Sequence, residues 1–212
     1  IIYNEVKEDH KKTDDFSNKW PMTKVLVIAG EPSGDLHAAE VIKHLVCQCP
    51  EINFFGMGGD LMQQAGVRLI YHIRDSAVMG FTEVVSAIPK FALKQANLKK
   101  FLRQERPAMT ILVDFSGFNL GLAKYANRLS LPVIYYIPPK AWAWRASRAR
   151  AVARSTSAVA SIFPFEANFY KQAGANTYFV GHPLLDIAKS KHSVSSARKE
   201  LGINSNGQTI GL

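Results

Sequence analysis

Residues 24–35 read KVLVIAGEPSGD, an apolar run followed at once by a loop that contains two glycines. The run from Lys24 to Ala29 holds consecutive apolar residues, which is typical of a short strand buried on both faces. The glycines allow a tight turn, and a helical pattern follows at about 35–47. A buried strand that turns directly into a helix predicts an α/β fold.

The same alternation continues along the chain. Further predicted strands are Ile52 to Phe55, Met109 to Val113, Val133 to Ile137, Ala158 to Phe163 and Thr177 to Val180. Helical patterns separate them at about 90–105, 118–129, 142–154 and 165–173. Apolar strands joined by helices predict a Rossmann-like parallel sheet with helices on both faces. Ligands bind beyond the carboxyl ends of such strands, so the residues after each strand are the candidate site.

Composition narrows the classes of function. The chain has 212 residues, 47% of them hydrophobic, and no apolar run reaches the roughly 18 residues that a membrane span needs. Lys and Arg outnumber Asp and Glu by 26 to 17, which favours anionic partners. Aromatic residues lie mostly in the strand-like runs, so we expect no nucleic-acid partner. Cys47 and Cys49 lack the second pair that a zinc site needs, so we expect no metal there.

The loop at residues 30–35 carries the first candidate contacts. Amide groups at a helix start bind anions, but the carboxylates of Glu31 and Asp35 would repel a phosphate. Sugar hydroxyls fit this loop better, with Ser33 and Gly34 as further contacts. The alternative is a capped strand-to-helix turn without a ligand.

Asp114 directly follows the predicted strand at 109–113. A carboxylate at that point lies at the mouth of the crevice, where partial desolvation raises its pKa toward the range of a general base. Asn119, five residues later, is a candidate substrate contact. The alternative is that Asp114 caps the helix that starts near Phe118, and these residues alone do not separate the two roles.

Three later segments follow strands in the same way. Residues 138–145 (PPKAWAWR) form a rigid aromatic loop suited to stacking on a sugar or an acyl chain, with core packing as the alternative. The basic helix after it is either solvated or in contact with phosphate. The candidate contacts in these segments are Trp142, Trp144, Arg145, Glu166 and His182.

One stretch has the pattern of a helix that lies in a membrane interface. Apolar residues at helical spacing share one face, and Pro89 is predicted to start a second, lysine-rich helix. The predicted docking residues are Phe81, Val84, Val85, Ile88, Lys90 and Lys94. Burial of the apolar face against the sheet is the alternative.

Together the motifs resemble the lipid-A-disaccharide synthase family, which are inverting glycosyltransferases of the GT-B type. The matching segments are GEPSGD (30–35), AVMGFTEV (77–84), VDFSGFN (113–119), PPKAWAWR (138–145), FPFE (163–166) and GHPL (181–184). The resemblance implies two Rossmann-like domains. Residues 22–186 would form the acceptor-side domain and residues 187–212 the crossing into a truncated donor domain for the UDP-sugar. Residues 1–21 would be a disordered extension or an artefact of expression.

The resemblance also implies a reaction. A 2,3-diacylglucosamine unit would pass from UDP to 2,3-diacylglucosamine 1-phosphate, giving the β-1,6 disaccharide of lipid A biosynthesis and UDP, without metal or cofactor. Asp114 aligns with the proposed base of the family, although Gly117 stands where many members carry a second Asp.

The same resemblance implies a location at the inner face of the inner membrane, with peripheral contact to acidic lipid. Most groups that stabilise the leaving UDP would belong to the second domain, so this chain alone is expected to bind the acceptor without turnover. The patterns carry no prediction of oligomeric state.

Two competing functions remain at this point. A GT-B relative that acts on a soluble UDP-sugar, such as an epimerase or another glycosyltransferase, would share the architecture without an acyl-chain surface. A non-catalytic glycolipid-binding domain would share the cleft without the reaction.

Overall fold

The computed structural model describes residues 23–76, 81–141, 146–189, 192–204 and 207–210. One compact unit ends at Gly181, and a second comprises His182–Leu212. The second unit contains the short helices α8 (Leu184–Ile187) and α9 (Val194–Glu200). Residues 208–210 are in neither a helix nor a strand.

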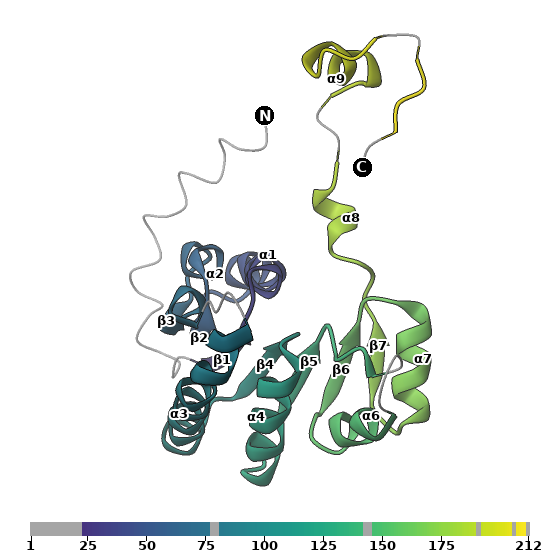
Figure 1. The fold of residues 1–212 in the computed structure, drawn as a ribbon. Helices are drawn as coiled ribbons and strands as arrows, with labels where there is room; N and C mark the ends of the chain where they lie inside the picture. Colours follow the sequence, from purple (N-terminus) through teal and green to yellow (C-terminus); the bar gives the residue numbers. More distant parts are fainter. Residues whose placement is uncertain (1–22, 77–80, 142–145, 190–191, 205–206, 211–212) are drawn as a thin grey trace. The chain divides into compact units, whose positions relative to one another are not determined.

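The first unit is built on a parallel sheet (Figure 1). Its strands are β1 (Thr23–Ala29), β2 (Ile52–Gly58), β3 (Arg68–His72), β4 (Met109–Val113), β5 (Val133–Tyr136), β6 (Ala158–Ser161) and β7 (Thr177–Phe179). Within the described residues their order is β3-β2-β1-β4-β5-β6-β7, and each neighbouring pair is parallel. The predicted Rossmann-like fold class is confirmed.

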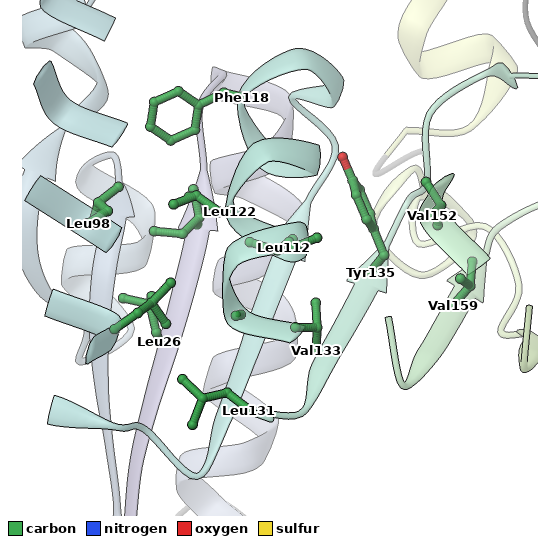
Figure 2. Close-up of a cluster of buried hydrophobic side chains, with 14 of the residues drawn as sticks. Leu26, Leu98, Leu112, Phe118, Leu122, Leu131, Val133, Tyr135, Val152 and Val159 are labelled. Atoms are coloured by element: carbon green, nitrogen blue, oxygen red, sulfur yellow. The ribbon is translucent and has the colours of Figure 1, made fainter. Parts of the chain in front are cut away.

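Helices cover both faces of this sheet. They are α1 (Pro32–Gln48), α2 (Asp60–Gln64), the 3-10 helix η4 (Ile73–Ser76), α3 (Phe81–Glu105), α4 (Ser116–Arg128), α6 (Ala146–Ala153) and α7 (Pro164–Gln172). On β1, Leu26 belongs to a buried cluster with Leu98 of α3 and Leu122 of α4 (Figure 2). The next residue, Val27, belongs to a second cluster with Ile42 of α1. Successive residues of one strand therefore serve two separate cores, which explains its continuous apolar run.

The prediction that a second helix starts at Pro89 is wrong. Instead of starting a new helix, Pro89 lies inside α3, which runs without a break from Phe81 to Glu105. Proline lacks an N–H and removes one backbone hydrogen bond from a helix interior. Further along α3, Leu98 and Leu102 are fully buried in the core, and this packing stabilises the continuous helix.

The topology defines where a ligand site belongs. β1 lies between β2, which is the next strand in the chain, and β4, which is the third strand after β1. The order of the strands reverses at β1 and β4, and the loops after these strands flank the crevice in which ligands of open α/β sheets bind.

Candidate active site

The turn between β4 and α4 has an unusual backbone. Asp114 and Phe115 are consecutive residues in the left-handed region, with φ of 45° and 47°. Aspartate is among the residues that tolerate this conformation, whereas phenylalanine rarely adopts it. Ile137, at the end of β5, is also left-handed with φ of 56°, which is costly for a β-branched residue. Strained residues of this kind cluster at functional sites, because the surrounding structure must hold them in place.

Two buried side chains hold the backbone of Asp114. The Asn119 amide nitrogen and the Tyr135 hydroxyl each donate to the Asp114 carbonyl oxygen at 2.9 Å. Tyr135 reaches this loop from β5 (Figure 2). Burial and the nearby charge of Asp114 raise the pKa of the Tyr135 hydroxyl, so it stays protonated and remains a donor. These two donors bind the main chain of Asp114, whereas its carboxylate lines the cleft.

Asn119 therefore has a structural role in place of the predicted contact with substrate. It is fully buried, and its amide nitrogen also donates to the Val113 carbonyl at 3.2 Å. The helix-cap alternative for Asp114 finds no support either, because Phe115 occupies the N-cap position of α4 and no side chain caps it.

Asp114 lines a cleft of about 510 Å³ at the carboxyl ends of β4, β5 and β6. The lining residues are Asp114, Ser116, Ile137, Pro138, Lys140, Ala141, Arg148, Ile162, Phe163 and Glu166. All of them belong to the first compact unit. The volume is in the usual range for small-molecule sites.

The electrostatics of the cleft suit a general base. Burial raises the pKa of the Asp114 carboxyl, and a backbone hydrogen bond from Phe115 and the charges of Lys140 and His37 offset part of that rise. A carboxylate with a raised pKa accepts a proton more readily near neutral pH than an ordinary aspartate does. Lys140 and Arg148 bring positive charge to the same cleft.

The loop after β1 meets the loop after β4. A Cβ atom at Gly30 would lie only 2.1 Å from the Phe115 ring, so this close approach requires glycine. Burial and the negative charge of Asp114 raise the pKa of the Glu31 carboxyl, which places Glu31 within electrostatic reach of Asp114. Ser33 is exposed on the first turn of α1, and Gly34 is buried with its Cβ position 3.3 Å from Ala29 Cβ.

Asp35 also departs from its predicted role. The carboxylate is buried and accepts hydrogen bonds from the amides of Gly59 at 2.7 Å, Met62 at 3.1 Å and Leu61 at 3.2 Å. These amides start α2, so Asp35 caps that helix from α1 instead of contacting a sugar.

Glu166 also lines the cleft. It is 2% exposed, and its carboxylate accepts a hydrogen bond from the Ser161 hydroxyl at 3.1 Å. Nearby, the Tyr170 hydroxyl donates to the Pro139 carbonyl. Burial and the charge of Glu166 raise the pKa of Tyr170, so this donor is also retained. Tyr170 thereby holds the loop that carries Lys140.

Several predicted residues lie outside this geometry. Trp142, Trp144 and Arg145 fall outside the described residues. His182 opens the second unit, where its Nδ1 accepts a hydrogen bond from the Leu184 amide at 3.2 Å. Gly117, which departs from the second Asp that the resemblance implies for many members, has open space where a Cβ atom would lie.

The predicted docking residues share α3. For Phe81, Val84, Val85 and Ile88 the structure describes the helix but not the side chains. Lys90 is exposed, and the Lys94 ammonium lies 5.3 Å from the centre of the Tyr71 ring. Among the described helices, none combines the length and the apolar character needed to cross a membrane.

Sequence reasoning missed the residues that organise the cleft. Tyr135, Tyr170 and Lys140 were not among the candidate site residues, although all three lie in or beside apolar segments. A tyrosine inside a buried strand signals a hydrogen-bond partner for its hydroxyl, and Tyr135 carries that signal.

Comparison with known proteins identifies the family that this chain matches. A family model described as lipid-A-disaccharide synthetase matches residues 25–212. The lipid-A-disaccharide synthase of Myxococcus xanthus is 39% identical over 189 residues, which cover 89% of this chain and 49% of that protein. Lipid-A-disaccharide synthase 1 of Legionella pneumophila strain Lens is 41% identical, covering 90% of this chain and 50% of that protein. The chain spans about half the length of the curated relatives it matches.

A solved structure shares the fold. The UDP-GlcNAc 2-epimerase from Neisseria meningitidis, bound to UDP-GlcNAc, matches with a TM-score of 0.56 and 14% identity. The match covers 84% of this chain and 52% of that one. At this level of identity the likeness concerns the fold alone.

Proposed function

The chain belongs to the lipid-A-disaccharide synthetase family, and from this premise we propose that it forms the acceptor-binding part of a glycosyltransferase. The whole protein transfers 2,3-diacylglucosamine from UDP to the 6-hydroxyl of 2,3-diacylglucosamine 1-phosphate. The products are the β-1,6-linked disaccharide 1-phosphate and UDP. The observation that carries this proposal is the Asp114 carboxylate, which lines the cleft while other residues hold its main chain.

In the proposed mechanism Asp114 is the general base. Its carboxylate takes the proton of the acceptor hydroxyl as the oxygen attacks C1 of the donor sugar. The bond from C1 to the phosphate oxygen breaks on the opposite face, and its electron pair leaves with UDP, so the configuration at C1 inverts. A positioned base contributes about 10²- to 10⁴-fold to such a step.

The cations of the cleft support a phosphorylated substrate. Lys140 and Arg148 line the same cleft as Asp114, and both favour phosphate oxygens by charge. Glu31 lies within electrostatic reach of Asp114 from the loop after β1. We propose that Glu31 and Ser33 contact hydroxyls of the acceptor sugar and that Glu166 contributes to the substrate site. We propose a UDP-linked donor for the whole protein, as the family that the sequence matches implies.

The test measures UDP release from the diacylated donor, using this chain together with whatever its gene encodes after Leu212. Asp114→Asn keeps the size of the side chain and its tolerance of left-handed backbone, and activity should fall at least about 100-fold. Asp60→Asn, which changes an exposed carboxylate on α2, is the matched control and should keep full activity. Full activity of Asp114→Asn would remove Asp114 from the mechanism. Equal turnover of a soluble UDP-sugar without lipid would favour the epimerase-like alternative.

We also propose that the amino-terminal turns of α3 dock on acidic lipid at the cytoplasmic face of the inner membrane. The net charge of +9 and the exposed Lys90 favour an anionic surface. Replacing Val84 and Ile88 together by Ser should weaken association with acidic vesicles. Leu185→Ser, which removes an exposed leucine of the second unit, is the control. Unchanged vesicle association in the double variant would contradict docking through α3.

A further inference from the structure

Part of the lining of the cleft is apolar. The side chains that line it include Ile137, Pro138, Ile162 and Phe163, which follow β5 and β6. The lining also includes the charged residues Asp114, Lys140, Arg148 and Glu166. A cleft that combines charged groups with an apolar surface fits a ligand that is itself amphipathic.

A pair of stacked rings extends this apolar surface to the solvent. Phe163 and Phe165 have ring centres 5.5 Å apart and an angle of 17° between their planes. Phe163 lines the cleft, whereas Phe165, on the first turn of α7, remains 51% exposed. We use the term apolar wall for Ile137, Pro138, Ile162, Phe163 and Phe165. An apolar surface that runs from a cleft into solvent gains free energy when an apolar ligand covers it.

We propose that the apolar wall binds one acyl chain of the acceptor lipid. This inference rests on the proposed function and adds to it the place where the lipid part of the acceptor lies. In this arrangement the reacting hydroxyl lies at Asp114 and the acceptor phosphate lies beside Lys140 and Arg148. The apolar wall is then the part of the cleft that can cover an acyl chain. The chain runs along Phe163 and leaves the cleft over the exposed ring of Phe165.

The test uses n-alkyl phosphates, which carry a phosphate and one alkyl chain but no sugar. Butyl, hexyl and octyl phosphate are titrated into this chain below their micelle concentrations, and the dissociation constants are measured by calorimetry. Each methylene that becomes buried should tighten binding up to about fourfold. Phe165→Ser should flatten the gain from hexyl to octyl phosphate while it leaves butyl phosphate binding unchanged, and Phe165→Leu should restore part of that gain.

Tyr178→Ser is the matched control. Tyr178 on β7 is 57% exposed, close to the exposure of Phe165, but it does not line the cleft. Its loss should leave the dependence on alkyl length intact. An unchanged length dependence in Phe165→Ser, or an equal flattening in Tyr178→Ser, would overturn the proposal.

A second measurement separates a bound acyl chain from a bilayer surface. Association with acidic vesicles should be the same for Phe165→Ser and the unaltered protein, since the apolar wall takes one chain and not a membrane. A large loss of vesicle binding in Phe165→Ser would overturn the assignment. Because alkyl phosphate binding requires no turnover, the acyl-chain site stands or falls separately from the glycosyltransferase activity.

Discussion

Two aspartates follow the central strands of the sheet, and they use their oxygens in opposite ways. Asp35, after β1, places its carboxylate against three backbone amides at the start of α2. Asp114, after β4, accepts hydrogen bonds from Asn119 and Tyr135 through its main-chain carbonyl. The first carboxylate is fully engaged in the fold, whereas the second lines a cleft. The lesson is that a carboxylate stays accessible in a cleft when buried side-chain donors hold its residue through the main-chain carbonyl.

The largest effect on stability should come from Asp35. Replacing it by Ala leaves the amides of Gly59, Leu61 and Met62 without their buried acceptor, and we expect the free energy of unfolding to fall by about 3 kcal/mol. Urea denaturation measures this. Asp60→Ala changes an exposed carboxylate on the same short helix and should stay within about 1 kcal/mol. Similar losses of stability in Asp35→Ala and Asp60→Ala would show that the buried Asp35 carboxylate contributes no more to folding than an exposed one.

A smaller effect should follow from Tyr135→Phe. This change removes one of the two donors to the Asp114 carbonyl and should cost about 1 kcal/mol of stability. UDP release by the whole protein should fall through kcat, with KM for the acceptor nearly unchanged, because the base is held less firmly. Tyr170→Phe removes the α7 hydroxyl that donates to the Pro139 carbonyl, and it controls for the loss of a buried hydrogen bond. If kcat in Tyr135→Phe matches that of the unaltered protein, the hydrogen bond from Tyr135 to the Asp114 carbonyl does not contribute to catalysis.

The smallest effect concerns the stability of Asp114→Asn as a function of pH. Because burial raises the pKa of Asp114, the native state keeps its proton at pH values where the unfolded chain has lost it. The native state is therefore favoured below the ordinary aspartate pKa, and this advantage is lost as pH rises through the raised pKa.

Asparagine has no such proton, so Asp114→Asn should gain stability relative to the unaltered protein as pH rises through that range. The gain at neutral pH should amount to a few tenths of a kcal/mol, since Asp114 is only half buried and solvent screens its charge. Denaturation at a series of pH values measures it. A variant that loses stability at neutral pH would show that ionised Asp114 stabilises the fold.

Local patterns were sufficient for most of the sheet. The predicted strand at 109–113 coincides with β4, because four apolar residues and a β-branched threonine leave few alternatives for a short buried segment. β3 (Arg68–His72) was missed: it lies at the edge of the sheet, none of its residues is fully buried, and it begins with a charged side chain. α2 was missed as well, since it has only five residues and its cap comes from another helix.

The candidate site was harder to predict because its contacts join distant parts of the chain. The position of Asp114 after a strand was visible in the sequence. The engagement of Asp35 depends on amides at Gly59 and beyond, and the hold on Asp114 depends on Tyr135. Neither partner is adjacent in sequence. Only the folded structure therefore shows that backbone amides bind the Asp35 carboxylate and that the Asp114 carboxylate lines the cleft.

The pairing of β1 with β4 has a consequence for how this protein reaches its native state. Each of the other strand pairs joins neighbours along the chain, but here Val25 must find Met109. Closing a loop of this length costs conformational entropy, which slows the pairing of distant strands. We therefore expect strands β1–β3 and strands β4–β7 to pair first, and β1 to pair with β4 last. The close approach of Gly30, in the loop after β1, to Phe115, in the loop after β4, would then form only when folding is complete.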